Sequence, residues 1–219
     1  MGDRAAKTGR RVIALRVRAL LAGALVLGLG SSVTLASWTD SDFATGSFGA
    51  SVFQTESNAT KPYDASAAWN TSDVPPGAAL VFDAVSMSPG TSVYAPFAIR
   101  TKAGSVAGEV VLGAPSVASS GTGDAELGAA LRYRVVRPAT CEASSFTGSP
   151  SFVVGGVAAE PLTSGQAAGV VNPLPGATAT QPGVPTQFCF EVTLPAGASN
   201  ALQGQTATAT WQFTATSSS

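Results

Sequence analysis

Side chains that commonly carry catalysis are scarce in this sequence, and histidine is absent altogether. Histidine is the commonest general base and metal ligand in proteins, and it is the middle member of a serine hydrolase triad. The acids Asp40 and Asp42 stand two residues apart in a Ser/Thr-rich stretch, a setting more typical of solvated carboxylates than of calcium ligands. We therefore predict no catalytic, cofactor-binding or metal-binding residue, and we expect that the protein is not an enzyme.

Two aromatic residues near the C-terminus, Trp211 and Phe213, are the remaining candidates for a ligand site, as a platform for carbohydrate. They alternate with threonines over residues 206–216. Because side chains alternate between the two faces of a strand, this pattern predicts one apolar face and one hydroxyl face. The two rings are therefore predicted to lie in the core.

The two cysteines, Cys141 and Cys189, both follow the segment that we interpret as an export signal. Thiols delivered outside the cytoplasm oxidise and persist as disulfides, so we predict one bridge between them. Closing a loop of this length stabilises a fold by roughly 4 kcal/mol in the chain-entropy model. The alternative is a pair of free thiols.

The first 36 residues have the organisation of a signal peptide. Six of the twelve Lys and Arg residues come first, and twelve residues without a polar side chain follow, Ala19–Gly30. Small residues at Thr34 and Ala36 predict cleavage between Ala36 and Ser37, and hence a secreted or cell-surface protein. The alternative is retention of this segment as a membrane anchor, which would be the protein's only contact with a membrane.

The remaining chain, residues 37–219, carries six basic and twelve acidic residues, a net charge of −6. Binding to nucleic acid needs clustered Lys and Arg that displace counterions from phosphates. This charge balance excludes nucleic acid as a partner.

Small, β-branched and turn-forming residues dominate the composition, and charged residues make up only 11%. Short apolar runs alternate with Pro/Gly turns and show no βαβ order, which predicts an all-β, two-sheet antiparallel sandwich of the jelly-roll kind over residues 54–219. The predicted strands are Ala79–Met87, Ser92–Lys102, Gly108–Leu112 running on to Val117, Leu131–Arg137, Phe152–Val154, Gln187–Leu194 and 206–216.

Two other segments of the domain are expected not to be strands. Asp124–Leu131 begins with a helix-capping acid and predicts a helix of about two turns. Residues 158–185 are rich in Gly, Pro and Ala, and predict a long irregular loop.

Between the signal and the domain, residues 37–53 place a large aromatic residue at every fifth position: Trp38, Phe43, Phe48 and Phe53. This segment can be extended. It is either a free arm or the first strand of the sandwich.

The stretch LVLGLGSSVTLASWTDSDFATGSF resembles the signal and N-terminus of the TasA/camelysin family. The likeness lies in the order of features: a Gly-rich end of the apolar run, a Thr-x-Ala processing site at Thr34, Trp38 followed closely by Asp40, and the segment Ala44–Phe48. A second likeness is the Ser88-Pro89-Gly90 turn between two predicted strands.

This resemblance implies a jelly-roll domain that is exported and then processed by a SipW-type signal peptidase. It also implies self-association into biofilm-matrix fibres, in which each subunit donates its N-terminal strand to the next. The arm could act in this way, since an open sheet edge accepts a strand through backbone hydrogen bonds. Two alternatives are a monomeric secreted or surface-associated binding module and a camelysin-like protease, although the chain lacks the HExxH ligands of a zincin.

Overall fold

The computed structural model describes residues 13–24, 41–47, 50–75, 77–82, 86–120 and 126–218. The chain divides into two units, Met1–Phe48 and Gly49–Ser219. In the first unit, residues 13–24 form a helix with exposed side chains, and residues 41–47 have no regular secondary structure. Among the helices within these ranges, none is long and apolar enough to cross a membrane.

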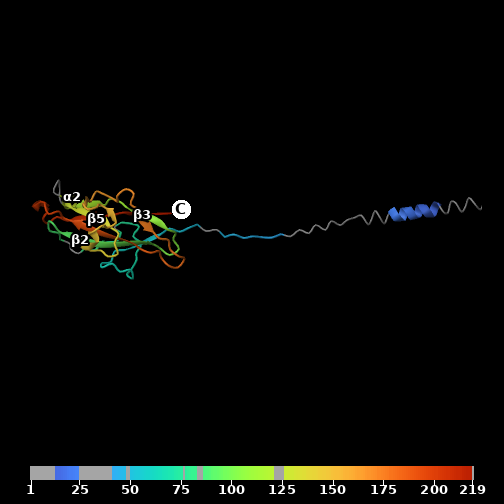
Figure 1. The fold of residues 1–219 in the computed structure, drawn as a ribbon, viewed down its shortest axis with the longest axis horizontal. Helices are drawn as coiled ribbons and strands as arrows, with labels where there is room; N and C mark the ends of the chain where they lie inside the picture. Colours follow the sequence, from blue (N-terminus) through green and yellow to red (C-terminus); the bar gives the residue numbers. More distant parts are fainter. Residues whose placement is uncertain are drawn as a thin grey trace, which may run out of the picture. The chain divides into compact units, whose positions relative to one another are not determined.

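The second unit is an antiparallel sandwich, which confirms the predicted all-β class (Figure 1). Its larger sheet has the order β1-β2-β9-β5-β6, with β7 also paired to β5. These strands are β1 (Thr55–Asn58), β2 (Ser92–Thr101), β5 (Arg132–Val136), β6 (Phe152–Val154), β7 (Glu160–Pro161) and β9 (Thr186–Thr193).

The facing layer is built mainly from two long chain segments that pair twice. They form β3 (Gly108–Leu112) with β11 (Phe213–Ser217), and β4 (Ser116–Ser119) with β10 (Ala207–Thr210). Three residues, 113–115, stand opposite two, 211–212, so the ladder is interrupted by a bulge at Pro115, which has no N–H to donate. The predicted continuous strands 108–117 and 206–216 are therefore each divided in two.

The segment predicted as strand Ala79–Met87 is not a strand in its described part, residues 79–82 and 86–87. Leu80, Phe82 and Met87 do pack on the core. The apolar pattern thus correctly identified side chains that pack, partly buried, against the core. A ladder also needs a neighbouring strand, and no described residue pairs with this segment.

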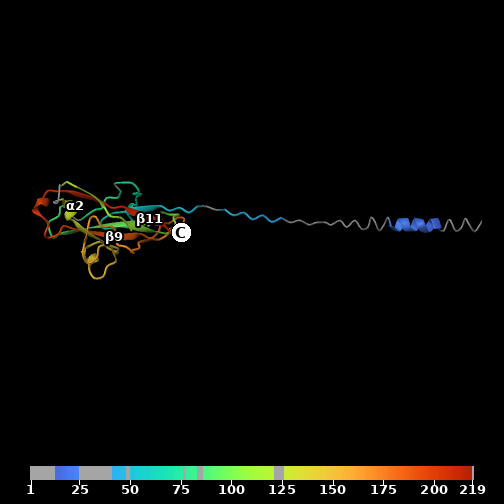
Figure 2. The ribbon, with the colours of Figure 1, turned by 90° about the horizontal axis from the view of Figure 1, so that it is seen from above.

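Within the described residues of the second unit, helical structure is limited to single turns: α2 (Leu127–Ala130), η2 (Ala143–Phe146) and η3 (Asn200–Leu202). The predicted helix Asp124–Leu131 is wrong in extent, since only α2 is helical within its described residues. Leu131 is already extended, because it leads directly into β5. Both views place α2 at the opposite end of this unit from the C-terminus (Figures 1 and 2).

Residues 158–185 contain two strands of two residues each, β7 and β8 (Pro173–Leu174), and are otherwise irregular. β8 pairs with β3 and completes the order β11-β3-β8. Leu162, Asn172 and Leu174 are buried. The Asn172 amide donates to the Val110 carbonyl oxygen at 3.0 Å, so this connection is attached to the second sheet.

An aromatic layer joins the two sheets. The Phe213 ring of β11 stacks on Phe97 of β2, with centroids 4.6 Å apart, and lies 5.1 Å from Phe188 of β9. Trp211 lies 5.0 Å from Phe190 and 5.8 Å from Tyr133. Both C-terminal aromatic residues pack against the core, which confirms the core positions predicted for them.

Tyr133 is fully buried in this layer, and its hydroxyl donates to the Ser164 carbonyl oxygen. Burial raises the pKa of Tyr133 to about 12. Between pH 10 and 12 the unfolded chain ionises this phenol while the folded chain keeps it neutral, so the free energy of unfolding should fall as pH rises, by up to about 3 kcal/mol. Urea unfolding across this pH range should show that the free energy of unfolding falls less steeply with pH in Tyr133→Phe than in the wild type. Identical pH dependence of the two proteins would contradict the raised pKa of Tyr133.

Candidate functional site

The residues predicted to serve export and assembly fall into three groups. The cleavage pair Ala36 and Ser37 and the arm residues Trp38 and Phe48 lie outside the described residues. Phe43, in the first unit, has 94% of its surface exposed. Phe53 lies in the second unit.

Phe53 packs on its own domain. Val52 pairs in parallel with Ser105, and the Val106 N–H donates to the Val52 carbonyl oxygen at 3.0 Å. The Phe53 ring covers Gly108: a Cβ atom added at Gly108 would lie 2.7 Å from Cε2 of Phe53. The contacts therefore assign Phe53 to the body of the domain, and the unit boundary precedes it at Phe48 and Gly49.

Cys141 and Cys189 form a disulfide with a Cα–Cα distance of 5.1 Å, so the predicted bridge is present and neither thiol is free. It ties the segment that carries η2 to the outer face of β9. A small second cluster forms there, with Val136, Phe146 and Cys189 buried. A structural disulfide persists in oxidising surroundings, which indicates an environment outside the cytoplasm.

Charged groups beside this cluster satisfy one another. Arg134 Nε donates to Glu191 Oε2 at 2.5 Å, and the guanidinium lies 5.1 Å from the centroid of the Phe146 ring. The Tyr94 hydroxyl donates to Glu191 Oε1 at 3.3 Å. Burial, followed by the negative charge of Glu191, raises the pKa of Tyr94. The arrangement is a paired network that holds η2 on the sheet.

The longest unpaired backbone edge in the described part of the chain is that of β10 and β11. Each pairs on one side only, with β4 and β3. Residues 206–217 contain no charged residue and no proline, the two features that commonly protect edge strands.

The backbone hydrogen bonds of β10 and β11 show which backbone groups face this open edge. The carbonyl oxygens of Gln212 and Thr206 accept from Gly113 and Ser120, and the Ser218 N–H donates to Ala107. Even-numbered residues therefore face β3 and β4. Because backbone groups alternate along a strand, those of Ala207, Ala209, Phe213 and Ala215 point away from the ladder.

The acids of the arm form no site in the described region. Asp42 is exposed, and Asp40 lies outside the described residues. Over the described ranges, no three or more Cys, Asp or Glu side chains are grouped so that they could hold a metal ion.

No protein-family model matches the chain, and no curated protein matches it.

Replacing Gly108 with alanine tests whether Phe53 belongs to the domain. The new Cβ would collide with the Thr216 carbonyl oxygen and with the Phe53 ring. We expect a loss of about 1–3 kcal/mol in the free energy of unfolding, measured by urea denaturation. Gly156→Ala is the matched control, because no atom lies within 4 Å of its added Cβ. Equal stability of the two variants would show that the ring is not packed there.

Loss of the disulfide should destabilise the fold without changing its topology. The bridge closes a 48-residue separation, for which the chain-entropy model gives about 4 kcal/mol. The double variant Cys141→Ala/Cys189→Ala should therefore unfold at a markedly lower urea concentration, and reductant should shift the wild-type midpoint in the same direction. A reductant-insensitive wild-type midpoint would contradict the role given to the bridge.

Proposed function

We propose that this protein is an exported, non-enzymatic structural protein of the cell surface, and that it self-associates into extracellular fibres of the biofilm-matrix type. Its N-terminal segment is donated as a strand to the sheet of the next subunit. The observation that carries this proposal is the open edge of β10 and β11. The family resemblance of the N-terminal sequence supports it.

The edge is suited to accept a strand. It extends over residues 207–217 with one interruption at 211–212, and its outward-facing backbone groups form no hydrogen bond with the backbone of any other described residue. The side chains of Ala207, Ala209 and Ala215 are small, so an incoming backbone can approach closely. Main-chain hydrogen bonds along such an edge supply the affinity in strand addition.

The donor is the part of the arm that precedes the body. Phe53 is already used by its own domain, which leaves Trp38–Phe48 as the donated segment. Phe43 in this segment is exposed and is available as an apolar anchor. A contact between the start of one subunit and the edge of another does not close on itself, so it propagates a filament.

The leading alternative is a monomeric binding module at the cell surface. It differs from the fibre subunit in one observable property. After the signal has been removed, the purified binding module would have the mass of one chain in solution, whereas the fibre subunit would have the mass of an assembly. A protease is the more distant alternative, and a casein assay with and without chelator separates it from both.

Blocking the edge should prevent fibres while the domain stays folded. Ala215→Pro removes one outward-facing N–H and puts a ring in the path of an added strand, whereas Ala215→Ser keeps the N–H. We expect Ala215→Pro to raise the protein concentration needed for filaments roughly tenfold or more, seen by electron microscopy and sedimentation, since one hydrogen bond and close packing are lost. The serine variant should assemble normally.

Deletion of Trp38–Phe48 is a second test of the same proposal, and it should abolish filaments. When the arm is added back as a separate peptide, it should form a complex with the deletion variant but no fibre. Circular dichroism and the urea midpoint establish folding for each variant. If the Ala215→Pro variant and the deletion variant both formed filaments as readily as the wild type, strand donation to this edge would be refuted.

A further inference from the structure

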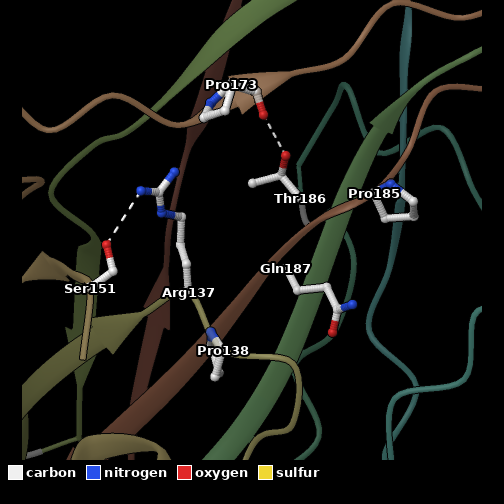
Figure 3. A pocket seen from close by; sticks show the side chains of 7 residues that line it. All are labelled: Arg137, Pro138, Ser151, Pro173, Pro185, Thr186 and Gln187. Carbon is white, nitrogen blue, oxygen red and sulfur yellow. Dashed lines mark hydrogen bonds between the residues drawn. The ribbon is translucent and has the colours of Figure 1, made fainter. Parts of the chain in front are cut away.

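A pocket of about 290 Å³ lies where four stretches of the chain meet, and none of its described lining residues belongs to β10 or β11 (Figure 3). Arg137 and Pro138 directly follow β5, and Ser151 directly precedes β6. The other lining residues are Pro173 of β8, Pro185 just before β9, and Thr186 and Gln187 at the start of β9.

Arg137 is the only charged residue among the described residues that line this pocket, and its side chain is held in place. One terminal nitrogen donates to the Val171 carbonyl oxygen at 2.9 Å, and the other donates to Ser151 Oγ at 3.3 Å. Figure 3 shows the side chain extending from beside Pro138 toward Pro173, with the guanidinium on the Ser151 side. The backbone of Arg137 is also fixed, since its N–H donates to the Ser151 carbonyl oxygen at 3.2 Å.

The charge of Arg137 has no carboxylate partner among the described residues. Arg100 is paired with Glu56 at 2.7 Å, and Arg134 is paired with Glu191. Arg137 has only a carbonyl and a hydroxyl acceptor, and its Nε is buried without any acceptor. A guanidinium has five N–H donors, so several remain unused at this site.

The other lining groups are neutral. The proline rings supply apolar walls, and the Thr186 hydroxyl, which donates to the Pro173 carbonyl oxygen, keeps its lone pairs free to accept. Gln187 adds an amide that can donate to an oxygen or accept from a hydroxyl. No acid repels an anion at this point, although the chain after Ala36 has a net charge of −6.

We propose that this pocket binds a single carboxylate group carried on a compact, ring-sized body, such as one acidic sugar unit or a small free acid. The planar guanidinium fork matches a carboxylate in geometry and in charge. The proline walls and Gln187 contact the body that bears the carboxylate. A pocket of this size holds one such unit at the surface and does not enclose a larger ligand.

Titration of the purified protein with sodium glucuronate, sodium benzoate and glucose tests the proposal. Calorimetry gives the affinities, and ¹⁵N-resolved NMR shows the position of binding through the signals of Thr186, Gln187 and the Arg137 side chain. We expect both carboxylates to bind at this position and glucose not to bind. Tighter binding of glucuronate than of benzoate identifies a sugar as the carrier, and the reverse identifies a free acid.

Arg137→Gln should weaken carboxylate binding about 10- to 100-fold, because the charged donor is lost. Arg132→Gln is the matched control. It is the first residue of β5, and its guanidinium donates to the carbonyl oxygens of Ala129, Ala130 and Leu131 and does not line the pocket. Equal binding by the wild type and Arg137→Gln, no binding of either carboxylate, or NMR changes confined to other positions would each overturn the proposal. The wild-type NMR map decides the matter even where Arg137→Gln does not fold.

Discussion

The aromatic layer centred on Phe213 is the contact on which the sandwich depends. Phe213 comes from the last strand and meets Phe97 and Phe188 of the larger sheet, while Trp211 meets Phe190 and Tyr133. Aromatic side chains bury large areas, and ring pairs at these distances add to the stabilisation from burial. The layer fixes β10 and β11 against the core through their apolar face, and this leaves their threonine face and their outer backbone edge to the solvent.

The opposite face of the larger sheet is stabilised in a different manner. The Cys141–Cys189 bridge, the Arg134–Glu191 pair and the Phe146 ring together hold η2 over β9. Residues on both faces of β9 are buried as a result, including the carboxylate of Glu191. A charge at such a position is tolerated because it is paired and hydrogen-bonded. The disulfide therefore does more than close a loop, since it keeps the cover in place under which this ion pair is partly shielded from water.

The parts of the fold that the sequence predicted well are short segments whose own residues carry the signal. The apolar run of β6 was predicted at its observed bounds, the alternating segment of β9 was predicted with a shift of one residue, and Trp211 and Phe213 pack against the core as their spacing indicated. Alternation is a local signal, whereas pairing is not. Residues 79–82 have the apolar pattern of a strand but no neighbour, and β8 is a strand of two residues because β3 lies beside it. The Arg137 pocket combines residues between 137 and 187 in the chain, and no motif in the sequence pointed to it.

The other sheet edges make the absence of protection at β10 and β11 significant. Ser57 of β1 exchanges two backbone hydrogen bonds with Asn70, and the part of β2 that extends beyond β1 contains Pro96 and has its Tyr94 carbonyl oxygen bound by Lys61. β8 has only two residues and begins with a proline, and the Val153 carbonyl oxygen of β6 accepts from Ala167. Each of these features hinders the addition of a foreign strand. Among the described residues, β10 and β11 thus form the longest edge without a charged residue or a proline, whereas β4, which also pairs on one side only, has four residues; this difference supports the proposed association through the β10–β11 edge.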